Sequence, residues 1–115
     1  MKKIDTLKKN YEFKNVLNKG KFYKGKYIIV YIIKNNKDKN IIGIAISKKI
    51  GKAVKRNRLK RLIRESYRLQ KDNLKNSYNI VFLWNKNIKE DCKYIQIQED
   101  MNKIFQRAGI LKWEK

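Results

Sequence analysis

Two apolar runs in the chain have the composition of β-strands. Residues 27–33 read YIIVYII and residues 78–84 read YNIVFLW, so β-branched and aromatic side chains dominate both runs. Alternation along a strand places the odd-numbered residues of the first run on one face and positions 28, 30 and 32 on the other. Both faces are apolar, so we expect both to be covered, or one of them to line a cleft.

A polar segment, residues 34–40, leads from the first run to the sequence IIGIAIS at residues 41–47. Two apolar runs joined by a short polar connection are typical of a β-hairpin. We therefore predict that residues 41–47 pair with residues 27–33. A further short strand is expected near residues 22–24, where the pattern is weaker.

Two other segments have helical spacing. Residues 11–18 place Phe13, Val16 and Leu17 on one face, with Asn10 as the expected N-cap and Gly20 as the terminator. A second helical face, which ends before a glycine at position 109, consists of Ile97, Met101, Ile104, Phe105 and Ala108. We expect both helices to pack on the sheet by these faces.

A third helix is expected in the most basic part of the chain, where residues 48–64 read KKIGKAVKRNRLKRLIR. A helical wheel separates its side chains into two arcs. The arc expected to pack contains Leu59, Leu62, Ile63 and Leu69. The opposite, polar arc contains Arg56, Asn57, Lys60, Arg61, Arg64 and Arg68.

These elements predict one domain that spans residues 1–115. The expected order is α-β-β-β-α-β-α, with helices packed on a small mixed sheet of about four strands, which is an α+β fold or α/β sandwich. No proline, Gly/Ser-rich linker or internal repeat divides the chain.

The net charge of the chain indicates what kind of partner it binds. The formal net charge is +21 at pH 7, which indicates a polyanionic partner. Of the 31 basic residues 25 are Lys and 6 are Arg, yet five of the six Arg lie between positions 56 and 68. Because the guanidinium group binds phosphate oxygens bidentately and stacks on bases, this clustering favours nucleic acid over a generic solvated face.

Several classes of function are disfavoured by the composition. The chain starts without an apolar signal region and has no apolar run near the roughly 20 residues of a membrane span, so we expect a cytoplasmic protein. The single Cys92 is expected to be a partly buried neutral thiol. With no His and only the adjacent acid pairs Glu90-Asp91 and Glu99-Asp100, we predict no catalytic residue and no metal site in the protein itself.

The basic segment also carries a recognisable motif. Residues 50–64, IGKAVKRNRLKRLIR, resemble the signature of the protein subunit of bacterial ribonuclease P, with its Arg-Asn-Arg core at Arg56, Asn57 and Arg58. The resemblance extends to LKKNYEFKNVLNKG at residues 7–20 and to IGIAISKKIG at residues 42–51. It covers nearly the whole chain.

The resemblance implies a function that composition does not. In that family the protein binds a large catalytic RNA, and the complex removes the 5′ leader of precursor tRNA with Mg²⁺ held mainly by the RNA. It also implies a left-handed βαβ crossover through the basic helix, against the usual preference. We expect the protein alone to be a monomer without membrane association.

The resemblance further implies two groups of site residues. The expected contacts to the catalytic RNA or nearby precursor are Lys52, Arg56, Asn57, Arg58, Lys60, Arg61, Arg64 and Arg68. The expected cleft for the single-stranded leader contains Phe13, Leu17, Tyr31, Lys48 and Lys49. Ordinary core packing is the alternative for the three apolar members of the cleft, and Leu17 stands where relatives often carry an aromatic residue.

Three hypotheses follow for the function. The first is the ribonuclease P subunit, and the second is a structural RNA-binding module such as a ribosomal protein. The third is a basic protein that compacts DNA.

Overall fold

The computed structural model describes residues 4–86 and 92–112. The order of its elements confirms the expected α-β-β-β-α-β-α order, with two short 3₁₀ turns added. These elements are α1 (Asn10–Lys19), β1 (Lys21–Lys24), β2 (Ile28–Lys34), β3 (Ile41–Ala45), η1 (Lys48–Ile50), α2 (Ala53–Gln70), η2 (Lys71–Asn73), β4 (Tyr78–Trp84) and α3 (Tyr94–Ala108). None of the described helices is long and apolar enough to cross a membrane.

The four strands form one mixed sheet in the order β1-β2-β4-β3. β4 is antiparallel to β2 and parallel to β3. The predicted hairpin between residues 27–33 and 41–47 is therefore wrong, because β4 lies between these two strands. Local composition could not show this, since the pairing depends on a strand almost forty residues further along the chain.

Asparagine side chains hold together the segments at the edge of the sheet where β2 ends and where β3 and β4 begin. The side chain of Asn40 donates to the carbonyl of Lys75 (2.9 Å) and accepts from the amide of Tyr78 (2.9 Å). The side chain of Asn35 donates to the side-chain oxygen of Asn79 (2.8 Å). These bonds fix the start of β4 between the end of β2 and the start of β3.

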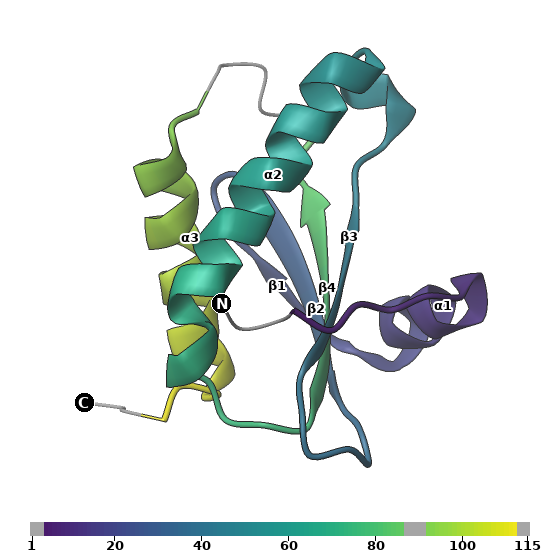
Figure 1. Cartoon of the computed structure of the whole chain (residues 1–115), viewed down its shortest axis with the longest axis vertical. Coiled ribbons are helices and arrows are strands. Elements are labelled where there is room, and N and C mark those ends of the chain that lie inside the picture. The colour runs from purple at the N-terminus through teal and green to yellow at the C-terminus, as the bar shows by residue number, and fades with distance from the viewer. Residues whose placement is uncertain (1–3, 87–91, 113–115) are drawn as a thin grey trace.

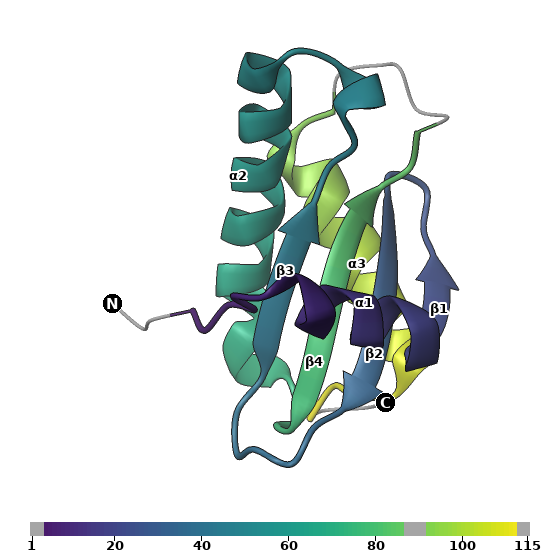
Figure 2. The same cartoon turned by 90° about the vertical axis from the view of Figure 1, so that its right-hand side faces the viewer.

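The chain passes from β3 through α2 to β4 in a left-handed crossover. Figure 2 views the sheet from the side of α1, with α2 and α3 behind it, and β4 lies to the right of β3 with both strands pointing upward. Seen from the α2 side, the second parallel strand is thus on the left of the first, which is the rare hand. Figure 1 shows the resulting layers, with α2 and α3 on one face of the sheet and α1 on the other.

The main core lies between the sheet and the pair α2 and α3. The even-numbered residues of β2, Ile28, Val30 and Ile32, are buried in it as expected from the alternation. Tyr27 was expected on the opposite face but is also buried in this core. Because β2 begins at Ile28, Tyr27 lies outside the alternation, and its amide donates to the carboxylate of Asp100 (2.8 Å).

The packing arc of α2 is shifted from the predicted one. Leu59 and Ile63 are buried and Leu62 is partly buried, but Leu69 is 60% exposed, so its predicted core position is wrong. The buried positions further along α2 are Ser66, Tyr67 and Gln70. They continue the spacing of one helical face from Leu59 and Ile63, and Leu69 falls outside it.

The ends of the outer helices agree with prediction to within a few residues. The first residue of α1 is Asn10, and the cap is Lys9 instead of the predicted Asn10. The side chain of Glu12 accepts from the amides of Lys8 (3.1 Å) and Lys9 (3.0 Å), and Gly20 ends the helix. α3 begins at Tyr94, three residues before its predicted face, and ends at Gly109 in the left-handed conformation (φ 70°).

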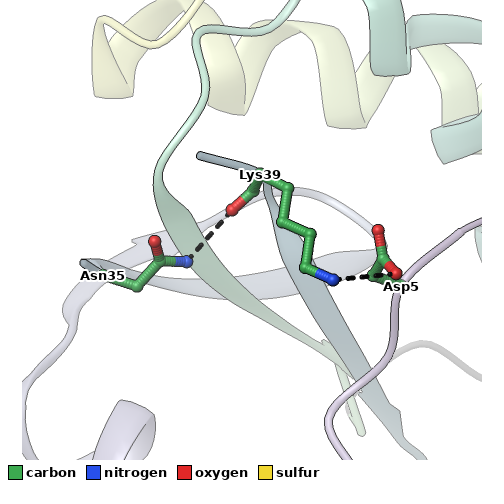
Figure 3. Close-up of polar contacts among 3 residues, drawn as sticks. All are labelled: Asp5, Asn35 and Lys39. Carbon is green, nitrogen blue, oxygen red and sulfur yellow. Dashed lines mark hydrogen bonds and ion pairs between the residues drawn. The ribbon is translucent and has the colours of Figure 1, made fainter. Parts of the chain in front are cut away.

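The N-terminal segment covers the outer edge of β3. Leu7 donates its amide to the carbonyl of Ile42 (2.8 Å), and Ile42 donates to the carbonyl of Asp5 (3.0 Å). Figure 3 shows Lys39 reaching Asp5 (3.4 Å) while its carbonyl accepts from Asn35 (3.2 Å). The edge strand is thereby paired, which removes a site for unwanted strand addition.

Candidate RNA interface

The polar arc of α2 forms a cationic surface on the outside of the molecule. Asn57, Arg58, Arg61 and Arg64 are exposed, and Arg56, Lys60 and Arg68 are partly exposed. Lys52 precedes the helix as its N-cap and is also exposed. We call these eight residues, all of them predicted RNA contacts, the basic ridge. The structure places all of them on α2 or at its start.

Internal contacts distinguish some members of the basic ridge from others. The guanidinium of Arg56 donates to the carbonyl of Gly51 (3.0 Å), and that of Arg58 donates to the carbonyl of Cys92 (3.4 Å). Arg56 therefore holds the turn before α2, and Arg58 ties α2 to the segment before α3. Both side chains have a structural role beside any contact with RNA.

At the far end of the ridge a cation is already paired. Arg68 donates to the carboxylate of Glu65 at 2.6 Å, one helical turn away. Within the described part of the chain, Arg61 and Arg64 have no ion pair. The charge of the ridge is therefore compensated by an acid at its far end and not at its centre, where a phosphate would replace water and counterions.

The second predicted group lies on the other side of the sheet. Phe13 and Leu17 of α1 and Tyr31 of β2 are partly buried in one apolar cluster with Val16 and Val81. The structure thus brings together the three apolar residues predicted for the leader cleft. All three side chains pack in this cluster, so the core-packing alternative explains part of their burial. Each side chain also remains partly exposed to solvent.

The strand register explains which part of this face is open. One row across the sheet contains Phe22, Tyr31, Val81 and Gly43. α1 covers the β3 and β4 end of this row, because Phe13 lies against Gly43 and Val81 is fully buried. Phe22 and Tyr31, at the other end of the row, keep exposed surface.

The next row lies further from α1. It contains Lys24, Ile29, Leu83 and Ala45, none of which is buried. Figure 2 shows α1 lying across the strands, with the sheet above it uncovered by the described elements. The open sheet face, as we call this surface, consists of Phe22, Ile29, Tyr31, Ala45 and Leu83.

Lysines flank the open sheet face at both edges. Lys48 and Lys49 are exposed in η1, three residues beyond the end of β3. Ser47 holds this turn by accepting from the amide of Lys49 (3.2 Å). Lys24 is exposed at the β1 edge. An apolar surface between two groups of cations is suited to a single-stranded polyanion whose bases stack while its phosphates meet the lysines.

Two residues important to the site were not predicted from the sequence. Phe22 is 51% exposed and its ring centroid lies 5.3 Å from that of Tyr31. Asp100, for which the sequence predicted no catalytic or metal-binding role, is buried and accepts from the amides of Lys26, Tyr27 and Ile28 (2.8, 2.8 and 3.0 Å). No sequence signal identifies Phe22, because its position beside Tyr31 depends on the register of β1 against β2.

The described residues contain no cluster that could hold a metal ion by itself. Residues 4–86 and 92–112 include no group of three or more His, Cys, Asp or Glu side chains in suitable proximity. The carboxylate of Asp100 is engaged by three backbone amides, and the pair Glu90-Asp91 lies outside the described residues. Cys92 is almost fully buried, deeper than expected.

The fold and the surface together define a small, strongly basic α+β protein with a left-handed crossover through a cationic helix. A family model described as Ribonuclease P matches residues 1–109. The chain therefore belongs to the ribonuclease P protein family, as the sequence motif predicted. Membership implies a role in tRNA 5′ processing and a partnership with the ribonuclease P RNA.

Individual relatives agree with this assignment over almost their full lengths. The chain is 41% identical over 112 residues to the ribonuclease P protein component of Clostridium novyi, covering 96% of this chain and 98% of the relative. It is 40% identical over 111 residues to that of Fusobacterium nucleatum, covering 94% of this chain and all of the relative.

Solved structures of the family have the same fold. The RNase P protein of Staphylococcus aureus superposes with a TM-score of 0.83 at 30% identity, covering 95% of this chain and 99% of that one. The RNase P protein from Thermotoga maritima gives a TM-score of 0.81 at 28% identity, covering 90% and 96%.

Proposed function

We propose that the basic ridge binds the catalytic RNA of ribonuclease P and that the open sheet face binds the 5′ leader of precursor tRNA. The protein then assists endonucleolytic removal of the leader without supplying the reacting groups. The observation that carries the proposal is the separation of the two surfaces. A cationic helix lies on one side of the sheet, and a partly exposed aromatic surface lies on the other.

The basic ridge suits a folded RNA for electrostatic reasons. Like charges one helical turn apart destabilise a helix by roughly 0.2 to 0.5 kcal/mol per pair. Packing of Leu59, Ile63 and Tyr67 holds α2 in place despite this repulsion. A polyanion on the outer face would relieve the repulsion, and each neutralised phosphate would release counterions.

The open sheet face suits a single strand that varies in sequence. Tyr31 and Phe22 offer ring faces, and Ile29, Ala45 and Leu83 extend the apolar surface between them and η1. Stacking on aromatic rings does not depend on base identity, because every base has a π-face. Such a surface would accept the different leaders of many precursor tRNAs.

We assign the hydrolytic chemistry, including the Mg²⁺ ions, to the RNA subunit. The donor set of the described residues supports this assignment, because it offers no carboxylate cluster and the chain has no His to act as a general base. The protein would act by holding RNA and leader in position, which can lower a barrier without a reacting side chain.

Reconstitution with the catalytic RNA tests the proposal. Cleavage and binding are measured for a precursor tRNA with a leader of several nucleotides and for mature tRNA, with and without the protein. We expect the protein to increase affinity for the precursor much more than for mature tRNA. Equal affinities with and without the protein would overturn the proposal. Displacement of the RNA by an equal concentration of duplex DNA would instead indicate the DNA-compacting function.

A further inference from the structure

Phe22 is an exposed aromatic residue that extends the open sheet face to its β1 edge. It lies directly opposite Tyr31 in the antiparallel pairing of β1 with β2. The two ring planes are inclined at 58° with centroids 5.3 Å apart, and half of Phe22 remains exposed. A ring in this position enlarges the surface that a base can contact beside Tyr31.

The core does not account for the position of Phe22. The neighbouring Tyr23 packs against the main core, so alternation directs Phe22 and Lys24 to the α1 side of the sheet. To the apolar cluster that contains Tyr31, α1 contributes one ring, Phe13, and the aliphatic side chains Val16 and Leu17. The exposed ring that lies beside Tyr31 is therefore that of Phe22, from β1.

The strand that carries Phe22 is held rigidly by α3. The guanidinium of Arg107 donates to the carbonyl of Lys24 (2.7 Å). The carboxylate of Asp100 accepts from the amides of the turn between β1 and β2. Two contacts from one helix thus fix the end of a strand that has only four residues, which preorganises its exposed side chains for binding.

We propose that Phe22 and Tyr31 form a two-ring platform for one nucleobase of the single-stranded leader. Lys24 contacts the phosphate next to that nucleotide. This inference rests on the proposed leader function of the open sheet face. Because the rings are inclined at 58°, a base lying flat on Phe22 meets Tyr31 at a tilted angle, which is a favourable geometry for aromatic groups.

The test uses the holoenzyme reconstituted with the catalytic RNA. The substrates are precursor tRNAs with 2-aminopurine at single leader positions, and a precursor with its leader cut back to one nucleotide. Phe22→Leu removes the ring but keeps an apolar side chain, and Phe22→Trp keeps a ring. Ile95→Ala is the matched control, because Ile95 is 58% exposed on α3, away from the open sheet face.

We expect Phe22→Leu to weaken binding of the full-leader precursor by about five- to tenfold, the lower range for loss of one stacked base. Affinity for the short-leader precursor and for the catalytic RNA should not change. Phe22→Trp and Ile95→Ala should bind like the wild type. In the wild type, one leader position should show quenched 2-aminopurine fluorescence, and Phe22→Leu should restore it.

The outcomes separate this inference from the function on which it rests. If Tyr31→Ala weakens precursor binding and Phe22→Leu does not, the two-ring platform is wrong while the leader site stands. If neither variant changes the preference for the full leader, the leader function of the open sheet face is wrong. If Phe22→Leu does not fold, the wild type still tests the platform, because unquenched 2-aminopurine at every leader position would overturn it.

Discussion

The ring of Phe13 lies directly on Gly43. A Cβ atom built at Gly43 would come within 2.6 Å of the ring carbons Cε1 and Cζ of Phe13 and 3.1 Å from Cδ1 of Leu7. Real side chains do not approach so closely, so the absence of a side chain at Gly43 lets α1 pack on β3. This contact sets which part of the α1 side of the sheet is covered and which part stays open.

Gly43→Ala should therefore displace α1. We expect the free energy of unfolding to fall by about 1 to 3 kcal/mol, the usual range for overpacking a core. Urea denaturation followed by circular dichroism measures it. The matched control is Ala45→Val, which adds volume two residues further along the same strand in the row that α1 does not cover. Equal effects of the two substitutions would contradict the role of Gly43.

Asp100→Asn should destabilise the chain more than a surface substitution does. Both carboxylate oxygens of Asp100 accept hydrogen bonds from backbone amides, three in all. The side chain of Asn has one acceptor oxygen, and its NH₂ group can only donate. We expect a loss of about 2 to 4 kcal/mol, because buried donors would be left without partners. Glu99→Gln, its exposed neighbour, is the control and should change the urea midpoint little. A stable Asp100→Asn variant would show that the β1–β2 turn holds without this anchor.

Position on a helix or strand was predictable where side chains follow a local period. The packing face of α3 appears where the sequence indicated, because its buried residues recur at helical spacing. β4 was predictable from its β-branched and aromatic composition instead, since residues on both of its faces are buried. The order of strands was not predictable from such spacing. Insertion of β4 beside β3 depends on contacts between segments that are distant in the chain, and the family resemblance supplied only the crossover.

The site shows the same division. Most cations of the basic ridge could be assigned from a helical wheel, since exposure of charged side chains on α2 follows from burial of the opposite arc. Lys52 and Arg58 came from the family resemblance. The role of Phe22 could not be assigned, because it depends on the register of β1 against Tyr31. The role of Asp100 could not be assigned either, because it depends on hydrogen bonds with the amides of a turn more than seventy residues earlier in the chain.

Tyr67 contributes a pH dependence at the alkaline end. Its hydroxyl is buried without a hydrogen-bond partner among the described residues, and burial, with a smaller effect of Asp5, raises the pKa of Tyr67 to about 12. The unfolded chain releases this proton near pH 10, so the contribution to stability is present below pH 10 and is lost as the pH rises towards 12.

Tyr67→Phe should remove that dependence. Near neutral pH we expect the variant to unfold with a free energy equal to the wild type or higher by about 1 kcal/mol, because an unpaired buried hydroxyl is removed. Above pH 10 the advantage of the variant should increase. Urea midpoints across this pH range measure the difference. A less stable variant at neutral pH would indicate that the hydroxyl has a partner in solution.

Glu12 contributes a pH dependence at the acidic end. The amides of Lys8, and then of Lys9, lower the pKa of Glu12 below its usual 4.5 by donating to its carboxylate. The folded pKa lies below the unfolded one, so the stabilising contribution is present above about pH 4.5 and is lost as the pH falls through the folded pKa.

Glu12→Gln should therefore be less stable than the wild type at neutral pH, and the gap should close in acid. Urea midpoints near pH 7 and at pH values below 4 give the comparison. Asn15→Gln, an exposed substitution on the same helix, serves as the control and should give a difference independent of pH. A gap between Glu12→Gln and the wild type that persists in acid would show that the carboxylate charge does not carry the effect.

The centre of the basic ridge offers the sharpest test of phosphate contact. Arg56 and Arg58 both hold internal hydrogen bonds, so replacing them mixes folding with binding. Arg61 and Arg64 are exposed, and no ion pair links either of them to an acid in the described ranges. We therefore choose the double substitution Arg61→Ala with Arg64→Ala, which should remove charge without loosening α2.

The double variant should bind the catalytic RNA more weakly, and its salt dependence should be shallower. Each phosphate contact removed lowers the slope of log K against log salt by about 0.7 to 0.9. Arg68→Ala is the matched control on the same helix, because the cation it removes is already paired with Glu65 at 2.6 Å and should change the slope less. Binding titrations over a series of salt concentrations give all three slopes.

Parallel lines for the wild type and the double variant would mean that phosphates do not contact the centre of the ridge. An equal drop for Arg68→Ala would mean that the ion pair with Glu65 opens when RNA binds.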